Sequence, residues 1–560
     1  MSNAGAATAL FERRARPRAQ RRTTGVLAAL AIAACGPLVP TAGVPLVSDG
    51  AALAAPGAAA GYVAVQPCRL ADTREGTGFS RLDGLTLQID SRNRCGTPAN
   101  ATSLALTLTV VDPQTAGYLT AWPANQTRPI VSNINFNGGQ IRANGSITRV
   151  DAAGAFRVFT NVSADVVVDV VGAFVPSGAV AAGRFVSRGP TRLMDTRAGS
   201  PLQPAARLSV PVPSGTPTDA VALVLNITIT ESAAPGFVTQ FPTGQAMPTS
   251  SVLNVDERNQ TRAASGIFPV SAAGASLYLS GGGHIIVDQV GYFTGPSAGV
   301  STEGLFTAYD PTRLLDTRGP SPLGNGVPLY PGGGLELTTN SGGAMAYNIT
   351  SVDGGTGFVT AYPAGTDRPG TSNVNSVGAG EVVANFAVTQ MSGRGLGIFS
   401  QSQTHVVVDL QGWFSGPTAT ATVAPPRNLA PPGPQPTYSA CLHDGLSTLN
   451  SLRSVNAALV MNPNAEAWAC AWALQLAIAG AISHSDSMAR SAAVGCGAGE
   501  NIAAAPGASI PSLYSMWFAS PTHLANVKNS IYRSVGIGFV IRTDSSGAQK
   551  IYGSTVFAVC

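Results

Sequence analysis

The chain has 560 residues, of which 44% are hydrophobic and only 11% are charged, with a formal net charge of +4 and an isoelectric point near 8.7. At roughly 150 residues per domain, this length predicts several domains rather than one. The apolar content is too high for a wholly disordered chain, which excludes intrinsic disorder as a description of the whole protein.

The first 54 residues have the order of a secretory signal. An arginine-rich start precedes an apolar run from Val26 to Cys35, and Ala52-Leu53-Ala54 is a small-x-small cleavage site. We therefore expect residues 1–54 to be a signal peptide and the protein to be secreted or held at the cell surface. The alternative is that Ile32 to Cys35 is a lipobox, in which case Cys35 is acylated and anchors the protein to the membrane.

The positive charge belongs to this leader. It contains six Arg and two acidic residues, so 27 of the 33 basic and 27 of the 29 acidic residues remain in the mature chain, which is neutral. A neutral chain lacks the electrostatic attraction for phosphate backbones, so we expect no nucleic-acid partner. No later segment has 18 uninterrupted apolar residues, so we expect no transmembrane span in the mature chain.

The cysteines predict disulfides. Six remain after Cys35, in two separated groups, and an even number in an exported chain favours disulfides over metal thiolates. Cys68 and Cys95 are alone in their region and are predicted to pair, which stabilises the fold by about 3 kcal/mol if chain entropy is the cause. The four others allow three pairings, which the sequence leaves open. They are Cys441, Cys470, Cys496 and Cys560.

Three similar units follow the leader, over residues 60–177, 182–296 and 303–416. Each unit opens with Arg-Leu-x-Asp-Thr-Arg and closes with an aliphatic run that ends in Asp. The opening phrases begin at Arg69, Arg192 and Arg313, and the closing aspartates are Asp169, Asp288 and Asp409. Short runs of Val, Ile, Thr and Phe alternate with Gly, Asn, Asp and Pro, which predicts seven to nine strands per unit. We expect all-β, β-sandwich-like repeats, with a closed barrel as the alternative.

The repeated Asp-Thr-Arg phrase has two interpretations. Its carboxylate could bind a cation or ligand, since Asp is a hard oxygen donor. We favour a turn in which Asp and Thr cap backbone amides and an Arg forks onto the carboxylate, because one carboxylate per unit is too few for a calcium site. His284 and His405 have no acidic or cysteine cluster beside them in the sequence, so we interpret them as core or surface residues.

The repeats resemble the uncharacterised tandem β-modules of exported proteins from GC-rich Gram-positive bacteria. That resemblance implies a spacer or a binding surface and carries no known activity.

A Pro-rich linker over residues 417–437 separates the repeats from a different kind of domain, residues 438–560. Such a segment is expected to be an extended spacer that forms neither strand nor helix. Beyond it the hydrophobic period changes from 2 to 3.6, which predicts an α+β domain. The predicted elements are a helix near Leu446 to Arg453, a helix over 465–482, a helix over 511–519, and a hairpin of 535–540 with 551–559.

Four motifs in this last domain occur in the order and spacing of one family. They are Asn450-Ser451-Leu452-Arg453, Ser483-His484-Ser485, Gly499-Glu500-Asn501-Ile502 and the segment from Trp517 to Asn526. In these motifs the domain resembles the bacterial CAP superfamily, or SCP domain, whose relatives include cysteine-rich secretory and pathogenesis-related proteins. The resemblance implies a three-layer α-β-α sandwich with a groove.

The resemblance also implies the residues of the groove. In that family two His and two acidic residues line the groove. The two His positions match His484 and His523 here, the first acidic position matches Glu500, and the second acidic position is Ser520. His484, Glu500 and His523 are therefore a candidate set for a divalent metal, most simply zinc, although one carboxylate fewer weakens a magnesium or calcium site. The alternative is that these three residues form a purely structural hydrogen-bonded cluster. Asn501 and Asn526 are interpreted as loop-fixing, Trp517 as core and Arg453 as a structural donor.

Three functions remain open at this point. The first is a binding protein, whose CAP-like domain takes a lipid-like or other small ligand, or a cell-wall partner, and is carried on a stalk of β-modules. The second is a metal-assisted hydrolase that uses the His and Glu groove. The third is a surface adhesin whose repeats are the active part. Because no nucleophile elbow, HExxH helix or paired-carboxylate signature occurs, we favour a protein that is not an enzyme.

Overall fold

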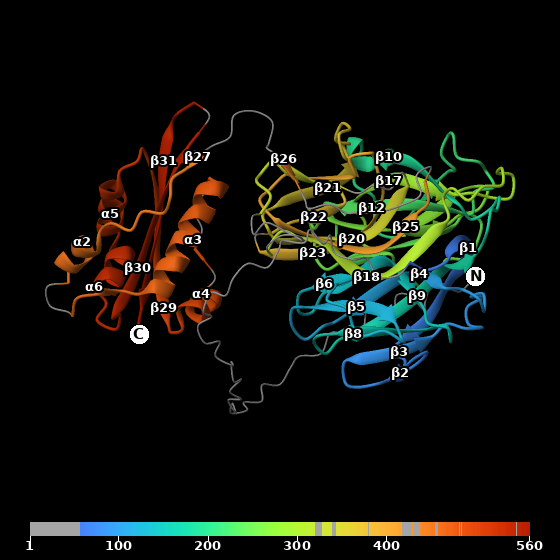
Figure 1. Cartoon of the computed structure of the whole chain (residues 1–560), viewed down its shortest axis with the longest axis horizontal. Coiled ribbons are helices and arrows are strands. Elements are labelled where there is room, and N and C mark those ends of the chain that lie inside the picture. Colours follow the sequence, from blue (N-terminus) through green and yellow to red (C-terminus); the bar gives the residue numbers. More distant parts are fainter. Residues whose placement is uncertain are drawn as a thin grey trace, which may run out of the picture.

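The computed structural model describes residues 56–319, 328–338, 343–378, 380–416, 427–429, 437–453, 457–480, 482, 484–485, 487–544 and 546–560. The expected signal peptide, with Cys35, and most of the Pro-rich linker lie outside these residues. Figure 1 shows the repeats as one β-rich body and the C-terminal region as a second body with helices on both sides of a sheet. None of the helices described is long and apolar enough to cross a membrane.

The described part of the chain is mostly strand. Repeat 1 contains β1 (Ala59–Asp72), β2 (Ser80–Arg81), β3 (Thr86–Asp90), β4 (Ser103–Val111), β5 (Gly117–Pro123), β6 (Ile134–Phe136), β7 (Ile141–Arg149), β8 (Ala155–Thr160) and β9 (Asp165–Pro176). Repeat 2 contains β10 (Phe185–Asp195), the 3-10 turn η2 (Thr196–Ala198), β11 (Ala206–Val210), β12 (Ala222–Thr230), β13 (Gly236–Pro242), β14 (Leu253–Val255), β15 (Arg262–Pro269), β16 (Ala275–Leu279) and β17 (His284–Phe293). Repeat 3 contains β18 (Phe306–Asp316), β19 (Gly334–Leu337), β20 (Ala344–Gly354), β21 (Gly357–Pro363), β22 (Val374–Ser376), β23 (Glu381–Gln390), β24 (Leu396–Ser400) and β25 (His405–Phe414).

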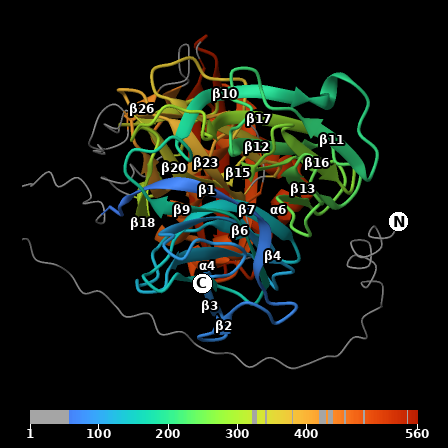
Figure 2. The ribbon, with the colours of Figure 1, turned by 90° about the vertical axis from the view of Figure 1, so that its right-hand side faces the viewer.

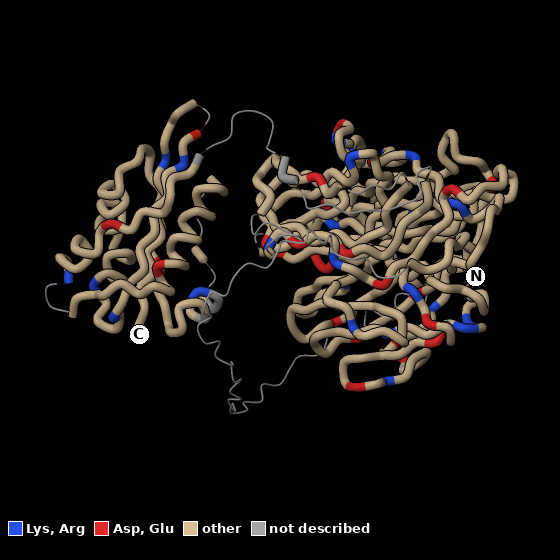
Figure 3. The backbone as a smooth tube through the Cα atoms, in the orientation of Figure 1, with Lys and Arg blue, Asp and Glu red and all other residues tan. Residues whose placement is uncertain are grey.

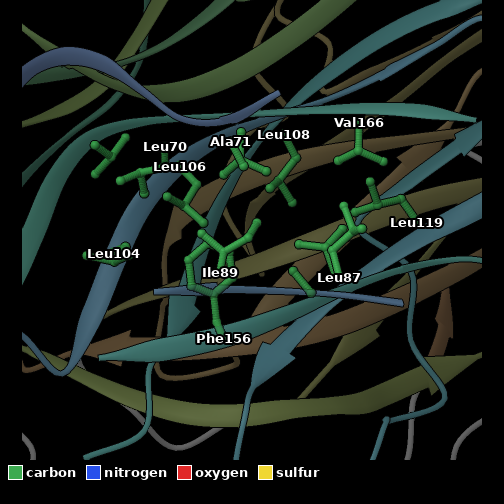
Figure 4. Packing of buried hydrophobic residues seen from close by; sticks show 14 of the residues in the cluster. Leu70, Ala71, Leu87, Ile89, Leu104, Leu106, Leu108, Leu119, Phe156 and Val166 are labelled. Atoms are coloured by element: carbon green, nitrogen blue, oxygen red, sulfur yellow. The ribbon is translucent and has the colours of Figure 1, made fainter. Parts of the chain in front are cut away.

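Each repeat has two sheets with a hydrophobic core between them, in agreement with the expected β-sandwich-like repeats. In repeat 1 the inner sheet has the order β1-β9-β4-β7 and the outer sheet the order β2-β3-β8-β5-β6. Leu and Val side chains from both sheets fill the space between them, around Phe156 (Figure 4). Every residue of β4 is buried, because the inner sheet is covered by its own core on one face and by the other repeats on the other.

Six aromatic rings from the three repeats meet at the centre of the β body. They belong to Tyr62, Phe174, Phe185, Phe293, Phe306 and Phe414. Each repeat contributes one Phe from near the end of its last strand, and the centroids of these three rings lie 5.7–6.3 Å apart. The ring from each repeat's first strand packs against the last-strand Phe of another repeat, with 4.4–4.6 Å between the centroids. Repeat 1 contacts repeat 2 in this way, repeat 2 contacts repeat 3, and repeat 3 contacts repeat 1. The repeats are therefore arranged around a common centre (Figure 2) and form one block rather than a linear stalk.

Glycine makes room for these rings. A Cβ on Gly172 would lie 2.2 Å from the Tyr62 ring, and the equivalent distances are 2.4 Å for Gly291 and Phe185 and 2.3 Å for Gly412 and Phe306. Such distances are far below normal carbon contacts, so a side chain at these positions collides with the central rings.

Buried amides join the repeats around this apolar centre. Asn144 Nδ2 of repeat 1 donates to Asn348 Oδ1 of repeat 3 at 2.9 Å, and Asn385 Nδ2 of repeat 3 donates to Asn226 Oδ1 of repeat 2 at 3.1 Å. Gln411 Oε1 accepts from a backbone N–H of repeat 1 at 2.7 Å. These hydrogen bonds between repeats form only when neighbouring repeats are docked, so they favour one arrangement of the three.

The first and last inner strands of the block share one sheet. Antiparallel pairing of β1 with β18 joins the inner sheets of repeats 1 and 3 into eight strands, β23-β20-β25-β18-β1-β9-β4-β7. Within it Ala60 is paired with Phe306, which is paired with Phe414. The start of β1 and the end of β25 therefore lie at the same end of the sheet.

The Asp-Thr-Arg phrase forms an ion-pair chain beside each inner sheet. Arg69 forks onto Asp169 at 2.9 and 3.2 Å and also donates to Asp72 at 2.9 Å, while Arg74 forks onto Asp72 at 2.9 and 2.6 Å. Burial raises the pKa of Asp169. For Asp72 burial is the largest single cause, but the hydrogen bonds from Arg74 and the charges of Arg74 and Arg69 together outweigh it and lower the pKa. The other repeats have the same pairs, so the geometry is that of the structural turn favoured from the sequence.

The C-terminal region has helices on both faces of an antiparallel sheet. Its elements are β27 (Thr437–Tyr438), α2 (Leu446–Ser451), β28 (Val460–Met461), α3 (Pro463–Ala479), α4 (Ser487–Val494), β29 (Ala498–Pro506), α5 (Ile510–Ala519), α6 (Pro521–Lys528), β30 (Ser534–Thr543) and β31 (Gln549–Ala558). The sheet order is β27-β30-β31-β29, with β28 parallel to β30. Helices α3 and α4 cover one face and α2, α5 and α6 the other (Figure 1).

Small residues let α3 approach the sheet closely. A Cβ on Gly536 or Gly538 of β30 would lie 2.0 or 2.5 Å from the backbone of Ala465 or Ala469 in α3. Asn462 caps the helix through its side chain, and Gly480 ends it with a φ of 71°. The helix expected over 465–482 therefore stops earlier, at a glycine that adopts the left-handed conformation.

One expectation about the linker is wrong. Residues Arg427–Leu429 form β26, which pairs with Gly334–Glu336 of β19 and extends the outer sheet of repeat 3. These three residues lie between prolines but have backbone N–H groups of their own, so they can pair although the surrounding sequence is rich in Pro.

Three disulfides are present in the structure. The predicted bond between Cys68 and Cys95 is one of them. The pairings that the sequence left open are Cys441 with Cys470 and Cys496 with Cys560. Disulfides of this kind are compatible with an extracellular protein.

We expect Gly172→Ala to lower the free energy of unfolding by about 1–3 kcal/mol, because its Cβ overpacks the central rings. Gly178→Ala is the matched control, since no atom lies within 4 Å of a Cβ there. Urea unfolding of the full chain measures both. Equal stability of the two variants would contradict close packing at the centre.

Candidate functional site

Glu500 is the buried centre of the predicted site. It lies on β29, its side chain is 1% exposed, and both of its oxygens accept hydrogen bonds from the protein. Ser485 donates to them through its backbone N–H at 2.9 Å and its hydroxyl at 2.8 Å. Arg490 Nη1 lies 3.3 Å from Oε2, and Ser554 Oγ lies 3.4 Å from Oε1. The structure therefore uses this carboxylate as an acceptor within the fold.

His484 lies on the solvent side of this carboxylate. Its Nδ1 is 3.0 Å from Glu500 Oε2, and its side chain is 60% exposed. Because Nδ1 faces the buried carboxylate, Nε2 on the other side of the ring faces away from Glu500. A carboxylate behind an imidazole fixes the ring and its tautomer, which is the usual way to hold a histidine that binds a metal or a ligand.

His523 lies near His484. Burial, and to a smaller extent the charge of His484, lower the pKa of His523, so its imidazole is neutral at physiological pH. It lies in α6, and its backbone carbonyl accepts from Asn501 Nδ2 at 3.0 Å. Asn526 Nδ2 in turn donates to Asn501 Oδ1 at 2.8 Å, so α6 is tied to the strand that carries Glu500.

The remaining residues named from the sequence have mainly structural contacts. Ser520 lies between α5 and α6, and its hydroxyl is 3.2 Å from Thr522 Oγ1. Trp517 is fully buried in the core. Arg453 is 2% exposed and donates to backbone carbonyls, including that of Val527 at 2.6 Å.

Two residues that hold the site were given no role from the sequence, although Ser485 lies in one of the four motifs. Ser485 supplies two donors to Glu500 and accepts from Trp468 Nε1 at 3.2 Å. Arg490 also donates to Ser485 Oγ at 2.6 Å and is itself buried. A lone Arg in an Ala- and Ser-rich segment of a weakly charged chain is the signal that could have identified it.

The metal set expected from the sequence is only partly assembled by this geometry. His484 and Glu500 are in contact and His523 is near them, but Glu500 already accepts from Ser485, Arg490 and His484. The two imidazoles are thus the groups suited to hold a zinc ion, with Glu500 behind one of them. In the described part of the chain, a group of three possible metal ligands lies at a different place. It consists of Cys441, His443 and Cys470, whose ligand atoms all lie within 4.8 Å of one another.

Comparisons with known proteins do not identify the chain. No protein family and no curated protein matches it. Among solved structures, a protein of an archaeal virus described by its triple jelly roll fold and turret assembly is 8% identical, over 63% of this chain and 92% of that one, with a TM-score of 0.13. A protein of Sulfolobus Turreted Icosahedral Virus is also 8% identical, over 61% and 86%, with the same TM-score. Scores this low establish no common fold.

We expect Glu500→Gln to lower the free energy of unfolding by about 3–5 kcal/mol, since it leaves Arg490 buried without its carboxylate. His484→Ala should change it by no more than about 0.5 kcal/mol, because that side chain is mostly exposed. Urea unfolding followed by tryptophan fluorescence tests both, with Trp468 next to Ser485 as a local reporter. A change in the free energy of unfolding for Glu500→Gln as small as that expected for His484→Ala would mean that Glu500 has no role in holding the fold.

Proposed function

We propose that this is an exported, non-enzymatic binding protein whose C-terminal region is a CAP/SCP-like domain. Its ligand, a lipid-like or other small molecule, contacts the outward edge of His484 and the neighbouring His523. The four motifs of the sequence and the helices on both faces of the sheet support the domain assignment. The paired cysteines support export.

One observation carries this proposal. Both carboxylate oxygens of Glu500 accept hydrogen bonds from within the protein, so Glu500 orients His484 but is not free to bind a ligand directly. A metal-assisted hydrolase that uses Glu500 as the base for water needs a free carboxylate oxygen, and this arrangement leaves none. The imidazole of His484, which Glu500 orients, and that of His523, whose pKa burial lowers, instead suit hydrogen bonding to a bound ligand.

This site is tested by native mass spectrometry of the full chain after incubation with vesicles of phosphatidylglycerol and cardiolipin. We expect a lipid adduct, and about tenfold weaker binding in His484→Ala and His523→Ala, since each removes one polar contact of about 1.4 kcal/mol. His443→Ala, an exposed histidine of the same region, is the control. No adduct, or adducts insensitive to His484→Ala and His523→Ala, would refute these two histidines as the ligand site.

The repeats support a second candidate function, adhesion to a polymer. Each outer sheet carries an aromatic pair with an Arg over it, on the face turned away from the core. The three sets, here called the outer platforms, are Tyr118, Phe159 and Arg128; Phe237, Tyr278 and Arg207; and Phe358, Phe399 and Arg368. The ring centroids are 6.0–6.1 Å apart in every pair. Three similar platforms, one on each repeat, suit a polymer with repeating anionic units, such as a cell-wall polysaccharide.

Co-sedimentation with purified Gram-positive cell walls tests the outer platforms. Because three linked sites gain avidity, we expect Tyr118→Ala alone to weaken binding modestly and the triple variant with Phe237→Ala and Phe358→Ala to weaken it by about 10²-fold or more. Val460→Ala, an exposed apolar position outside the repeats, is the control. Unchanged sedimentation of the triple variant would eliminate the platforms as a wall-binding surface.

A further inference from the structure

Four side chains with affinity for metals or protons lie together beside the middle of β30 in the C-terminal sheet. Cys441 and Cys470 form a disulfide, and His443 Nδ1 is 3.5 Å from Cys470 Sγ, with Nε2 at 4.0 Å. Glu466 Oε1 is 2.7 Å from His443 Nδ1. His443 is 46% exposed and Glu466 30% exposed, so the group is open to solvent.

Two short sequence spacings bring this group together. Cys441 and His443 lie two residues apart in the segment before α2, and Glu466 and Cys470 lie four apart on one face of α3. The close approach of α3 to β30 at Gly536 and Gly538 holds that helix face against the segment. The group is thus placed by the packing of the helix on the sheet as well as by the disulfide.

We propose that this group is a redox-controlled zinc site, in which Cys441, Cys470 and His443 bind one Zn²⁺ ion once the disulfide is reduced. The ligand atoms of the three residues lie within 4.8 Å of one another. Zn–S bonds of about 2.3 Å and Zn–N bonds of about 2.0–2.1 Å let atoms with that spacing converge on one ion after small shifts. Glu466 then has the role of the carboxylate that orients a zinc-bound imidazole.

The chemistry balances with a small-molecule thiol as reductant. A thiolate attacks one sulfur, the Sγ–Sγ bond breaks and the other cysteine leaves as a thiolate; a second thiol then displaces the first as a small-molecule disulfide. The protein gains two electrons and two protons as two thiols. Binding of Zn²⁺ releases those two protons and forms two zinc–thiolate bonds, with water in the fourth position.

The other two disulfides offer no such set. Cys95 Sγ contacts the Arg69 carbonyl oxygen, and Cys496 Sγ accepts from the Cys560 backbone N–H. Within the described ranges, a group of three ligand residues is found only at Cys441, His443 and Cys470. Reduction of the whole protein therefore creates a three-ligand site at one place, although it frees three cysteine pairs.

The test uses the full chain reduced with a water-soluble phosphine and titrated with Zn²⁺ against a chromogenic chelator. We expect one tightly bound zinc per chain after reduction, loss of this zinc in His443→Ala and in the Cys441→Ser/Cys470→Ser pair, and about 10-fold weaker binding in Glu466→Gln. Cys496→Ser/Cys560→Ser is the matched control and should retain the zinc. Co²⁺ in place of Zn²⁺ should give a thiolate-to-metal charge-transfer band, which a site of histidines alone lacks.

Several results would overturn the proposal. They are absence of zinc after reduction, zinc that persists in His443→Ala, absence of the thiolate band, and loss of the far-ultraviolet circular dichroism signal on reduction. The outcome is independent of the proposed ligand site, because zinc or lipid at His484 and His523 is measured without reductant and in the presence of His443→Ala.

Discussion

The central ring cluster is the interaction on which the β body depends. Each aromatic ring of a first strand is shared between its own repeat and the next, so no repeat can bury its inner sheet without the others. The apolar area of the inner sheets is removed from water only in the assembled block, which makes the three repeats one cooperative unit. The glycines opposite the rings and the amides around them restrict the block to one arrangement.

In both bodies of this weakly charged chain, buried carboxylates are paired with Arg. Charged residues of both signs are spread thinly along the backbone (Figure 3). Where a carboxylate is buried, as at Asp169 or Glu500, an Arg and further donors surround it. A buried carboxylate without such partners carries a large desolvation cost, so a chain with little charge can bury only those acids it can pair. The pairing at Glu500 leaves the exposed imidazole edge of His484 as the chemically available part of the site.

The sequence predicted local features well because they depend on local patterns. The repeats, their β-strands, the Cys68–Cys95 bond and the closing hairpin follow from period, spacing and isolation in the chain. Helix α4 was missed, since its Ala and Ser residues give little hydrophobic signal. The strand β26 was missed because the prolines on either side of it dominate the composition of the segment.

Features that depend on long-range packing could not be predicted. The recurrence of Phe174, Phe293 and Phe414 shows that each repeat needs an aromatic residue there, but nothing in a linear pattern shows that the three rings meet. The same holds for the site: resemblance named His484, Glu500 and His523, whereas Arg490 joins them only through the fold. The zinc-type grouping of Cys441, His443 and Cys470 likewise required the pairing of the cysteines, which spacing alone leaves undecided.

The pairing of Ala60 with Phe306 and of Phe306 with Phe414 has a mechanical consequence. The polypeptide enters the β body at β1 and leaves repeat 3 at β25. The start of β1 and the end of β25 lie at the same end of the eight-stranded sheet with only β18 between the two strands, so the repeats lie beside the path between the two ends of the chain. Three repeats of some 355 residues in all then add almost nothing to the reach of the C-terminal domain. A tension applied between an N-terminal attachment and that domain would load the strands β1, β18 and β25 and leave repeat 2 outside the line of force.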